Sequence, residues 1–487
     1  MSTATPAPTS TSREDRVPIL SKVAYGLGTA LDMWGHWLYP GVAYAVFMAY
    51  LGVRPEWVGT ALMLNRILDA FSDPFFGWLS DNTRTRWGRR RPFLLIGGIA
   101  AGLGLPMLFL FVAPGWSEKQ IFLYMIISSV LYVPLMSAFN MPFQSLGAEM
   151  SPDYNERTRV MSFKGAIQKV MEIGNFSALQ VATWAGMRFA AAPADGGPVQ
   201  SNTLLGMQIY TGALGAIMIV FSIVMFVSIR ERYYDRVISG HQEKVKLREA
   251  FFTTLRCKPF RIQLLFTLAF ALGNSVVGGL GYIATRYIVC NGAEGPAAEW
   301  NTWMGVAGSV GGVLGAMLIA QIAHALGKRS AAIATCLMAY VAYASGWWLY
   351  TPHIPWLQVL YSGGVAFVCA GFWMLSGSMG ADAMDYDELD TGKRREGSFS
   401  ACSSYTQKLG LSIGAGIPGW LLPLVDFDAK REGGVQTMET ITGIKTILVG
   451  LPLLGVTAAL LLVMRFPLTP DKVREIRAKL EARRGKV

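Results

Sequence analysis

Long apolar stretches separated by short polar ones recur along almost the whole chain. A helix needs about 20 mostly apolar residues to cross a bilayer, so each stretch predicts a membrane-spanning helix. Twelve such segments are predicted, at residues 22–50, 57–80, 92–113, 120–149, 159–188, 203–229, 260–290, 299–326, 329–350, 354–383, 397–425 and 441–465. The pattern therefore predicts an all-α integral membrane protein.

A polar, basic stretch between the sixth and seventh segments divides the helices into two groups of six. The first residues, "MSTATPAPTSTSREDRVP", lack the apolar core of a signal peptide and are expected to form a disordered cytosolic tail. The predicted organisation is a tail at 1–18, a six-helix bundle at 19–229, a cytoplasmic linker at 230–259, a second six-helix bundle at 260–466 and a basic cytoplasmic tail at 467–487.

Lysine and arginine are concentrated in every second loop. The loop after the second segment, "DNTRTRWGRRRP", holds five arginines, and the loops after segments four, six, eight and ten are also basic. Basic loops stay on the cytoplasmic side, so both termini are predicted to be cytoplasmic. The predicted location is the plasma membrane, or the inner membrane if the protein is bacterial.

A repeat relates the two halves. "GAEMSPDYNERTR" is followed by "AIQKV", and "GADAMDYDELDTGKRRE" is followed by "YTQKL". Each copy has Gly, Ala and an acid at the end of one helix, a charged loop, and Gln-Lys in the next helix. Two halves of this kind predict the major facilitator fold.

Composition agrees with a membrane protein. Hydrophobic residues make up 52% of the chain and charged residues 15%, against about 25% charged in soluble domains. The net charge of +11 follows from the basic loops, so no nucleic-acid partner is predicted. The sequence has no nucleophile–base arrangement, metal-ligand cysteine spacing or phosphate loop, which argues against an enzyme and against a cofactor.

Three ionisable residues lie inside the second segment, in "LNRILDAFSDPFFGW". Arg66, Asp69 and Asp73 are spaced i, i+3, i+7 and share one face of a helix, within an arc of about 60°. Two carboxylates one turn apart repel each other unless a cation or a shared proton lies between them. The spacing predicts a site for Na⁺ or H⁺, although a static salt-bridge cluster would also explain it.

Other polar groups lie within predicted spans. Asp32 and His36 share a face of the first helix, and Ser137, Asn140 and Gln144 form a stripe on the fourth. Neutral hydrogen-bonding groups suit a polyhydroxylated ligand, although such groups also join helices to one another. These residues are candidate substrate ligands.

Two lysines lie at corresponding places in the halves. Lys169 is a candidate ligand, but Glu172 three residues later is an equally suitable ion-pair partner. Lys408 has no acid nearby in the sequence, so it is predicted to pair with Asp69 or Asp73 and to bridge the halves. Trp373 is a candidate aromatic residue of the cavity.

Charged residues at the cytoplasmic helix ends are predicted to form ion pairs that hold that face closed. The candidates for this gate are Asp81, Arg89, Glu149, Arg157, Asp382 and Arg394.

Three blocks of the sequence resemble the glycoside–pentoside–hexuronide:cation symporters. They are "RILDAFSDPFFGWLSDNTRTRWGRRRPFLLIG", "NMPFQSLGAEMSPDYNERTR" and "ADAMDYDELDTGKRREGSFSACSSYTQKLG". The resemblance implies that Asp69 and Asp73 are cation-site carboxylates and that Ser137 replaces a threonine hydroxyl of that site. It further implies that Arg66 and Lys408 link the cation and sugar sites, and that Trp373 lines the cavity.

The sequence departs from that family at two informative positions. Ser72 stands where an asparagine neighbours the second aspartate, and Asn140 stands where a sugar-binding aspartate is usual. The solute and the choice between Na⁺ and H⁺ therefore stay open.

The resulting hypothesis is a monomeric secondary active symporter that imports a sugar or glycoside with Na⁺ or H⁺ by alternating access. Its expected partners are a small polar solute, the coupling cation and membrane lipid. A lysolipid or organic-anion cargo on the same fold is the alternative. A receptor without transport is disfavoured because no large domain lies outside the predicted spans.

Overall fold

The computed structural model describes residues 16–151, 154–189, 202–229, 254–392, 396–429, 431 and 435–484. In these ranges the chain is helical, and its one β-bridge joins Thr85 and Gly88. The first half contains α1 (Ile19–Ala43), η1 (Tyr44–Tyr50), α2 (Pro55–Asn82), α3 (Arg91–Leu110), α4 (Glu118–Glu149), α5 (Tyr154–Phe176), α6 (Ala178–Phe189) and α7 (Thr203–Ser228). The second half contains α10 (Lys258–Ala284), η2 (Thr285–Val289), α11 (Glu294–Leu326), α12 (Lys328–Leu349), α13 (Leu357–Thr391), α14 (Glu396–Leu421), η3 (Leu422–Val425), α15 (Met438–Met464) and α16 (Pro470–Arg484).

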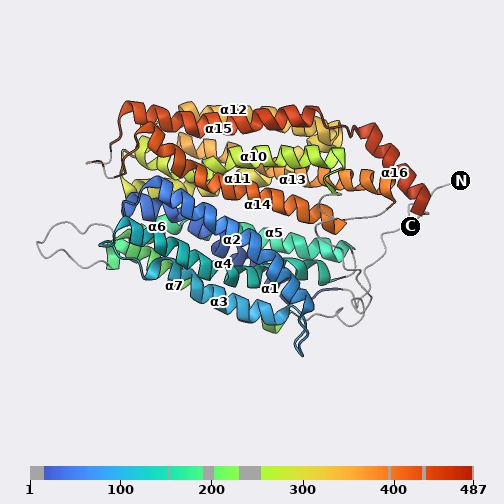
Figure 1. Cartoon of the computed structure of the whole chain (residues 1–487), viewed down its shortest axis with the longest axis horizontal. Helices are drawn as coiled ribbons and strands as arrows, with labels where there is room; N and C mark the ends of the chain where they lie inside the picture. The colour runs from blue at the N-terminus through green and yellow to red at the C-terminus, as the bar shows by residue number, and fades with distance from the viewer. Residues whose placement is uncertain are drawn as a thin grey trace, which may run out of the picture.

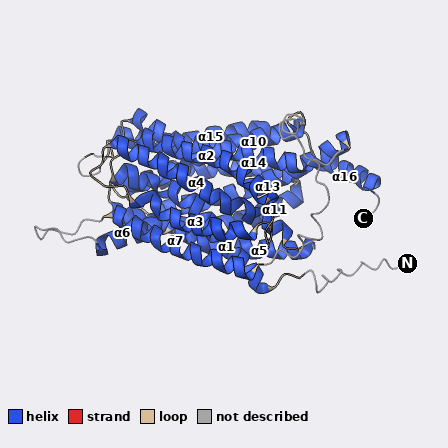
Figure 2. Cartoon of the chain, turned by 60° about the horizontal axis from the view of Figure 1, so that its bottom comes forward, coloured by secondary structure: helices blue, strands red, loops and turns tan. Residues whose placement is uncertain are grey.

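The helices run roughly parallel to one long axis and form two side-by-side groups, with α1 to α7 on one side and α10 to α15 on the other (Figure 1). Helices account for all the regular structure in both views (Figure 2). The start of α1 and the end of α7 lie at the same end of the molecule, because the Ser21 hydroxyl donates to the carbonyl of Ser228 at 2.8 Å. We call this the terminal end, since α16 also extends from it, and the opposite end the far end.

Nine helices in the described ranges are long and apolar enough to cross a membrane. A helix is present at each of the twelve predicted segments, but α1, α2, α5 and α6 fall outside those nine. Helices α1, α2 and α5 carry several of the ionisable residues discussed above, which lower their mean hydropathy. The count of twelve crossings stays a prediction.

Two of the predicted segments differ in detail from the structure. The segment predicted at 159–188 is divided at Ser177 into α5 and α6. The carbonyl of Phe176, at this break, accepts hydrogen bonds from Asn301 and Thr302 of α11 at 3.2 Å each. The segment predicted to end at 383 continues in α13 to Thr391, in turns that are acidic rather than apolar.

The first helix of each half ends in a π-helical turn, η1 after α1 and η2 after α10. Single π-helical turns are rare and often occur at functional sites. Their matching positions agree with the repeat seen in the sequence. The predicted basic tail forms α16, which packs against α13, whereas most of the predicted linker 230–259 lies outside the described residues.

Candidate functional site

A cavity of about 320 Å³ lies between the two halves, lined by α1, α2, α4 and α14. We call it the charged cavity. Its polar lining consists of Asp32, His36, Trp37, Arg66, Asp69, Asp73, Asn140, Ser404, Gln407 and Lys408. The fold thus brings together candidate residues from four helices that are far apart in the sequence.

The three charged residues of α2 face this cavity together. Arg66, Asp69 and Asp73 are each at least nine-tenths buried. Their common direction follows from the i, i+3, i+7 spacing, which places them on one face of the helix. Charges buried in this way normally have partners, because an isolated charge in an apolar medium is costly.

The partner from the other half is Lys408. Its ammonium group forms an ion pair with Asp73 and lies 3.5 Å from Oδ2 of Asp69. Lys408 and Asp73 are 335 positions apart in the sequence. One lysine of α14 therefore neutralises the carboxylate pair of α2 and joins the two halves at mid-depth.

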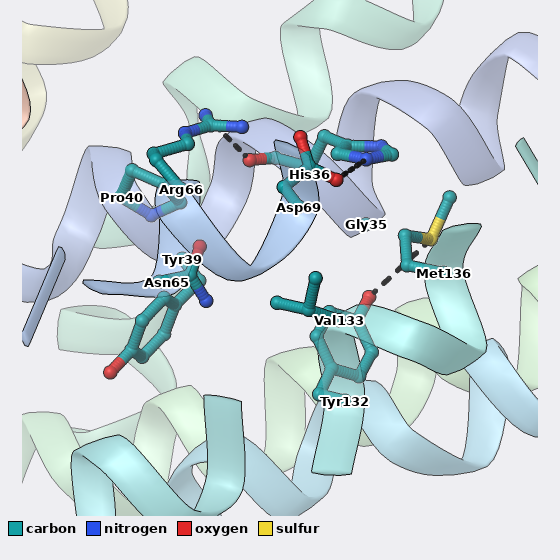
Figure 3. A pocket seen from close by; sticks show the side chains of 10 residues that line it. All are labelled: Gly35, His36, Tyr39, Pro40, Asn65, Arg66, Asp69, Tyr132, Val133 and Met136. Carbon is teal, nitrogen blue, oxygen red and sulfur yellow. Dashed lines mark hydrogen bonds and ion pairs between the residues drawn. The ribbon is translucent and has the colours of Figure 1, made fainter. Parts of the chain in front are cut away.

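His36 connects the carboxylates of two helices. Its Nε2 lies 3.3 Å from Oδ1 of Asp69, and its Nδ1 lies 3.3 Å from Oδ1 of Asp32. Arg66 donates to the backbone carbonyl of His36 at 3.0 Å and stacks over the ring of Trp37. Figure 3 shows Arg66, His36 and Asp69 close together at a small neighbouring pocket, so the guanidinium, imidazole and carboxylate groups form one network.

The predicted polar stripe of α4 divides into two parts. Ser137 is fully buried, and its hydroxyl lies 2.7 Å from that of Ser72, the residue before Asp73. Gln144 donates to Asn140 at 3.2 Å and to Asp32 at 3.1 Å. Asn140 lines the charged cavity, whereas Gln144 acts on it through Asp32.

Lys164 of α5 joins this second group, donating to Oε1 of Gln144 at 2.6 Å and lying over the ring of Phe143. The sequence analysis did not select Lys164 as a site residue. Its occurrence one helical turn before the repeated Gln-Lys pair is the signal that would have pointed to it.

Lys169 is placed differently from Lys408. Its ammonium group lies 2.8 Å from Glu172 on its own helix, and Lys169 is absent from the described linings of the charged cavity and of its neighbour. The local ion pair that the sequence left open as an alternative is the arrangement found. Trp373 lines that neighbouring cavity, of about 280 Å³, between α10, α13 and α14.

The far end of the interface between the halves is closed by direct backbone packing. The Tyr44 hydroxyl donates to the carbonyl of Ala415 at 3.2 Å, and the Trp420 indole donates to the hydroxyl of Thr60 at 3.1 Å. A Cβ atom at Gly59 would lie only 2.7 Å from the carbonyl oxygen of Gly416. Helices α2 and α14 therefore approach as closely as glycine allows.

The second cavity extends from mid-depth toward the terminal end. It includes Phe260 near the start of α10, Met384 in the last turns of α13 and Phe399 near the start of α14. The space between the halves therefore lies between a closed far end and the terminal end.

At the terminal end, the candidate gate residues that can be placed pair within their own halves. Asp81 lies 3.8 Å from Arg89 and 3.2 Å from Arg90, and Asp382 lies 2.7 Å from Lys328. The side chains of Glu149, Arg157 and Arg394 lie outside the described part of the structure. The predicted gate stays a prediction.

A buried carboxylate near these residues was not selected from the sequence. Glu156, at the start of α5, is 1% exposed and accepts from Lys22 at 2.6 Å and from the backbone N–H of Val17 at 3.0 Å. Burial works to raise the pKa of Glu156, but these donors outweigh it and hold the pKa below its usual value. The group therefore ties the start of α1 to the start of α5.

The profile of the family described as MFS/sugar transport protein matches residues 24–470. This range includes both halves and every residue of the charged cavity. The chain belongs to this family. It is therefore a multi-pass membrane transporter and not an enzyme, which confirms the fold class and the family resemblance predicted from the sequence.

Curated relatives match the transporter over nearly its full length. It is 25% identical to the glucuronide carrier protein homolog of Escherichia coli, covering 95% of each chain. It is 24% identical to the isoprimeverose transporter of Lactiplantibacillus pentosus, covering 90% of this chain and 88% of the other. Among solved structures, a D-xylose–proton symporter superimposes with a TM-score of 0.63 at 12% identity, covering 93% of this chain and 98% of that one, which shows the shared fold.

Proposed function

We propose that this transporter is a symporter that imports a sugar or glycoside together with Na⁺ or H⁺. The cation is held by Asp69 and Asp73 of α2, and the solute occupies the charged cavity. The observation that carries the proposal is the ion pairing of Lys408, from the other half, with both carboxylates. The names of the relatives, which include a glucuronide carrier homolog and an isoprimeverose transporter, support the class of solute.

Competition for the two carboxylates supplies the coupling. A cation or proton at Asp69 and Asp73 reduces the negative charge that holds Lys408, so the ammonium group becomes available to the solute or to Gln407 beside it. Cation binding and solute binding then favour each other, and that coupling is reciprocal. Because Lys408 lies on α14 and the aspartates on α2, the same exchange loosens or tightens the contact between the halves.

The charge of the cavity favours a polar sugar over a purely anionic cargo. Of the cationic residues that suggested an anion, Arg66 and Lys408 line the charged cavity together with three aspartates, while Arg286 bonds the carbonyl of Gly292 at the far end. A counterflow screen of neutral and anionic solutes separates the sugar proposal from the lysolipid or organic-anion alternative.

The test is uptake into membrane vesicles under separate Na⁺ and H⁺ gradients, with a panel of sugars and glycosides. We expect one gradient to drive accumulation by the unaltered protein. Asp73→Asn, expressed at the same level, should abolish gradient-driven accumulation while retaining solute counterflow, because the carboxylate pair is lost but the cavity remains.

The matched control is Asp471→Asn, which removes a carboxylate whose side chain is 87% exposed on α16. It should accumulate solute like the unaltered protein. Full concentrative uptake by Asp73→Asn would contradict the proposed coupling.

A further inference from the structure

The cavity beside the charged cavity carries a polar group without a partner. This second space, which we call the amide cavity, is lined by Gln263 and Thr267 of α10, Trp373 and Ser376 of α13, and Phe260 and Phe399 at its terminal-end side. It shares Ser404 and Gln407 of α14 with the charged cavity, so the two are adjacent.

Gln263, Thr267 and Ser376 form a buried network, each of them at least nine-tenths buried. The amide nitrogen of Gln263 donates to Oγ of Ser376 at 2.9 Å, to the carbonyl of Ser376 at 3.2 Å and to Oγ1 of Thr267 at 3.2 Å. Because a backbone carbonyl only accepts, the side of the amide that faces it must be the nitrogen. The orientation of Gln263 is therefore determined by its neighbours.

The other side of this amide is unpaired. No donor among the described residues bonds Oε1 of Gln263, although the residue is 3% exposed and lines the amide cavity. A buried amide oxygen without a partner costs free energy, since it has lost its hydrogen bonds to water. A donor from a bound molecule would satisfy it.

The remaining lining identifies the kind of molecule. Trp373, Phe260 and Phe399 supply aromatic surface, and the polar groups are hydroxyls and amides, with no ionisable side chain among the described lining residues. An aromatic wall with a few directed polar groups is typical of a small-molecule site. Such a lining fits an uncharged ring that carries hydroxyl groups.

We propose that the amide cavity is a second sugar subsite, which holds the uncharged ring of a two-ring glycoside while its first ring lies in the charged cavity. A ring hydroxyl donates to Oε1 of Gln263, and the ring packs against Trp373. Each cavity is close to 300 Å³, at the lower limit of about 300–1,000 Å³ for ligand pockets, and the shared Ser404 and Gln407 lie where the rings are joined. The inference rests on the proposed function and specifies its substrate as a disaccharide or larger glycoside.

The experiment compares each of three disaccharides with the methyl glycoside of its first ring, using glucuronic acid, xylose and galactose as that ring. Apparent affinity is measured by solute counterflow in proteoliposomes containing the full chain. The unaltered protein should bind at least one disaccharide more tightly than its methyl glycoside. Gln263→Met should weaken that disaccharide by about five- to tenfold, as expected for one lost hydrogen bond, and leave the methyl glycoside unchanged.

Gln358→Met is the matched control, because Gln358 is also fully buried in the second half but lies outside the described lining of both cavities. It should not alter the ratio of the two affinities. An equal loss for both solutes in Gln263→Met, no loss for either, or the same change in Gln358→Met would overturn the subsite while leaving sugar transport intact. No counterflow of any sugar by the unaltered protein would refute the proposed function and the subsite together.

Discussion

Asp69 is shared between two other helices. Its Oδ1 faces the imidazole of His36 on α1, and its Oδ2 faces the ammonium of Lys408 on α14. Asp73 bonds Lys408 through one oxygen, while no donor among the described residues bonds its buried Oδ1. At this scale the site consists of two carboxylates that a single lysine neutralises only in part.

Removing Lys408 should destabilise the protein. Lys408→Met leaves two buried carboxylates one helical turn apart without their cation, and breaking a buried ion pair from one side costs about 3–5 kcal/mol. We expect a lower unfolding temperature for the purified protein, measured by thermal denaturation at low Na⁺ concentration.

The double variant Lys408→Met/Asp73→Asn is the control for that prediction, since it removes one charge of each sign. It should be more stable than Lys408→Met alone, because fewer charges remain unpaired in the interior. If the double variant were less stable than the single one, the ion pair would not be the source of the loss.

At the scale of elements, the contact between α2 and α14 has two different parts. At mid-depth it consists of the ion pairs of Lys408, and at the far end it consists of glycine backbones. A Cβ atom at Gly419 would lie 2.3 Å from the carbonyl oxygen of Pro55, and one at Gly59 would lie 2.7 Å from that of Gly416. The far end therefore depends on small residues, as close helix contacts in membranes commonly do.

Gly59→Ala should push the far ends of α2 and α14 apart. We expect spin labels at Arg54 and Leu424, two exposed far-end positions, to give a distance distribution shifted to longer values. Gly77→Ala is the matched control on the same helix, because a Cβ atom there meets nothing within 4 Å. An unchanged distribution in Gly59→Ala would show that the far end is not held by this contact.

The break between α5 and α6 shows how the other side of the interface is closed. The ring of Phe176 packs where a Cβ atom of Gly305 would otherwise lie, 2.0 Å from the ring, and its carbonyl bonds α11. Nothing in the sequence of segment five predicts this break, because the partner that accepts the freed carbonyl lies in the other half.

At the scale of the whole molecule, the two halves meet at the far end and enclose the cavities between mid-depth and the terminal end. Alternating access requires the opposite arrangement to form during transport, with the far end open and the terminal end closed. Helices α2 and α14 connect both levels, since they carry the charged residues and the glycine contact.

The predicted orientation can be tested directly. If the terminal end is cytoplasmic, a fluorescent protein fused after Val487 should fluoresce, and alkaline phosphatase inserted at Gly115 should be active. The reason is that Gly115 lies between α3 and α4 at the far end, whereas the arginine-rich loop lies at the terminal end. Phosphatase inserted at Gly327, between α11 and α12, should be inactive, and the reverse pattern would contradict the orientation.

Part of the site was predictable from local patterns. The periodicity of α2 placed Arg66, Asp69 and Asp73 on one face, and the absence of an acid near Lys408 in the sequence pointed to a partner on α2. Lys169 shows the limit of such reasoning, because its repeat position matches that of Lys408 but its nearest acid is on its own helix. The network of Gln263, Thr267 and Ser376 was not predicted, since each residue alone resembles an ordinary polar contact between helices.

The sequence by itself determined the apolar spans, the division into two halves and the inward face of α2, because these follow from hydropathy and helical periodicity within one segment. Only the tertiary structure decided which half closes at the far end, that Lys408 meets Asp69 and Asp73, and that the oxygen of Gln263 faces a cavity. The physical reason is that these features depend on how helices far apart in the chain pack, and short polar stripes within single helices are compatible with several such packings.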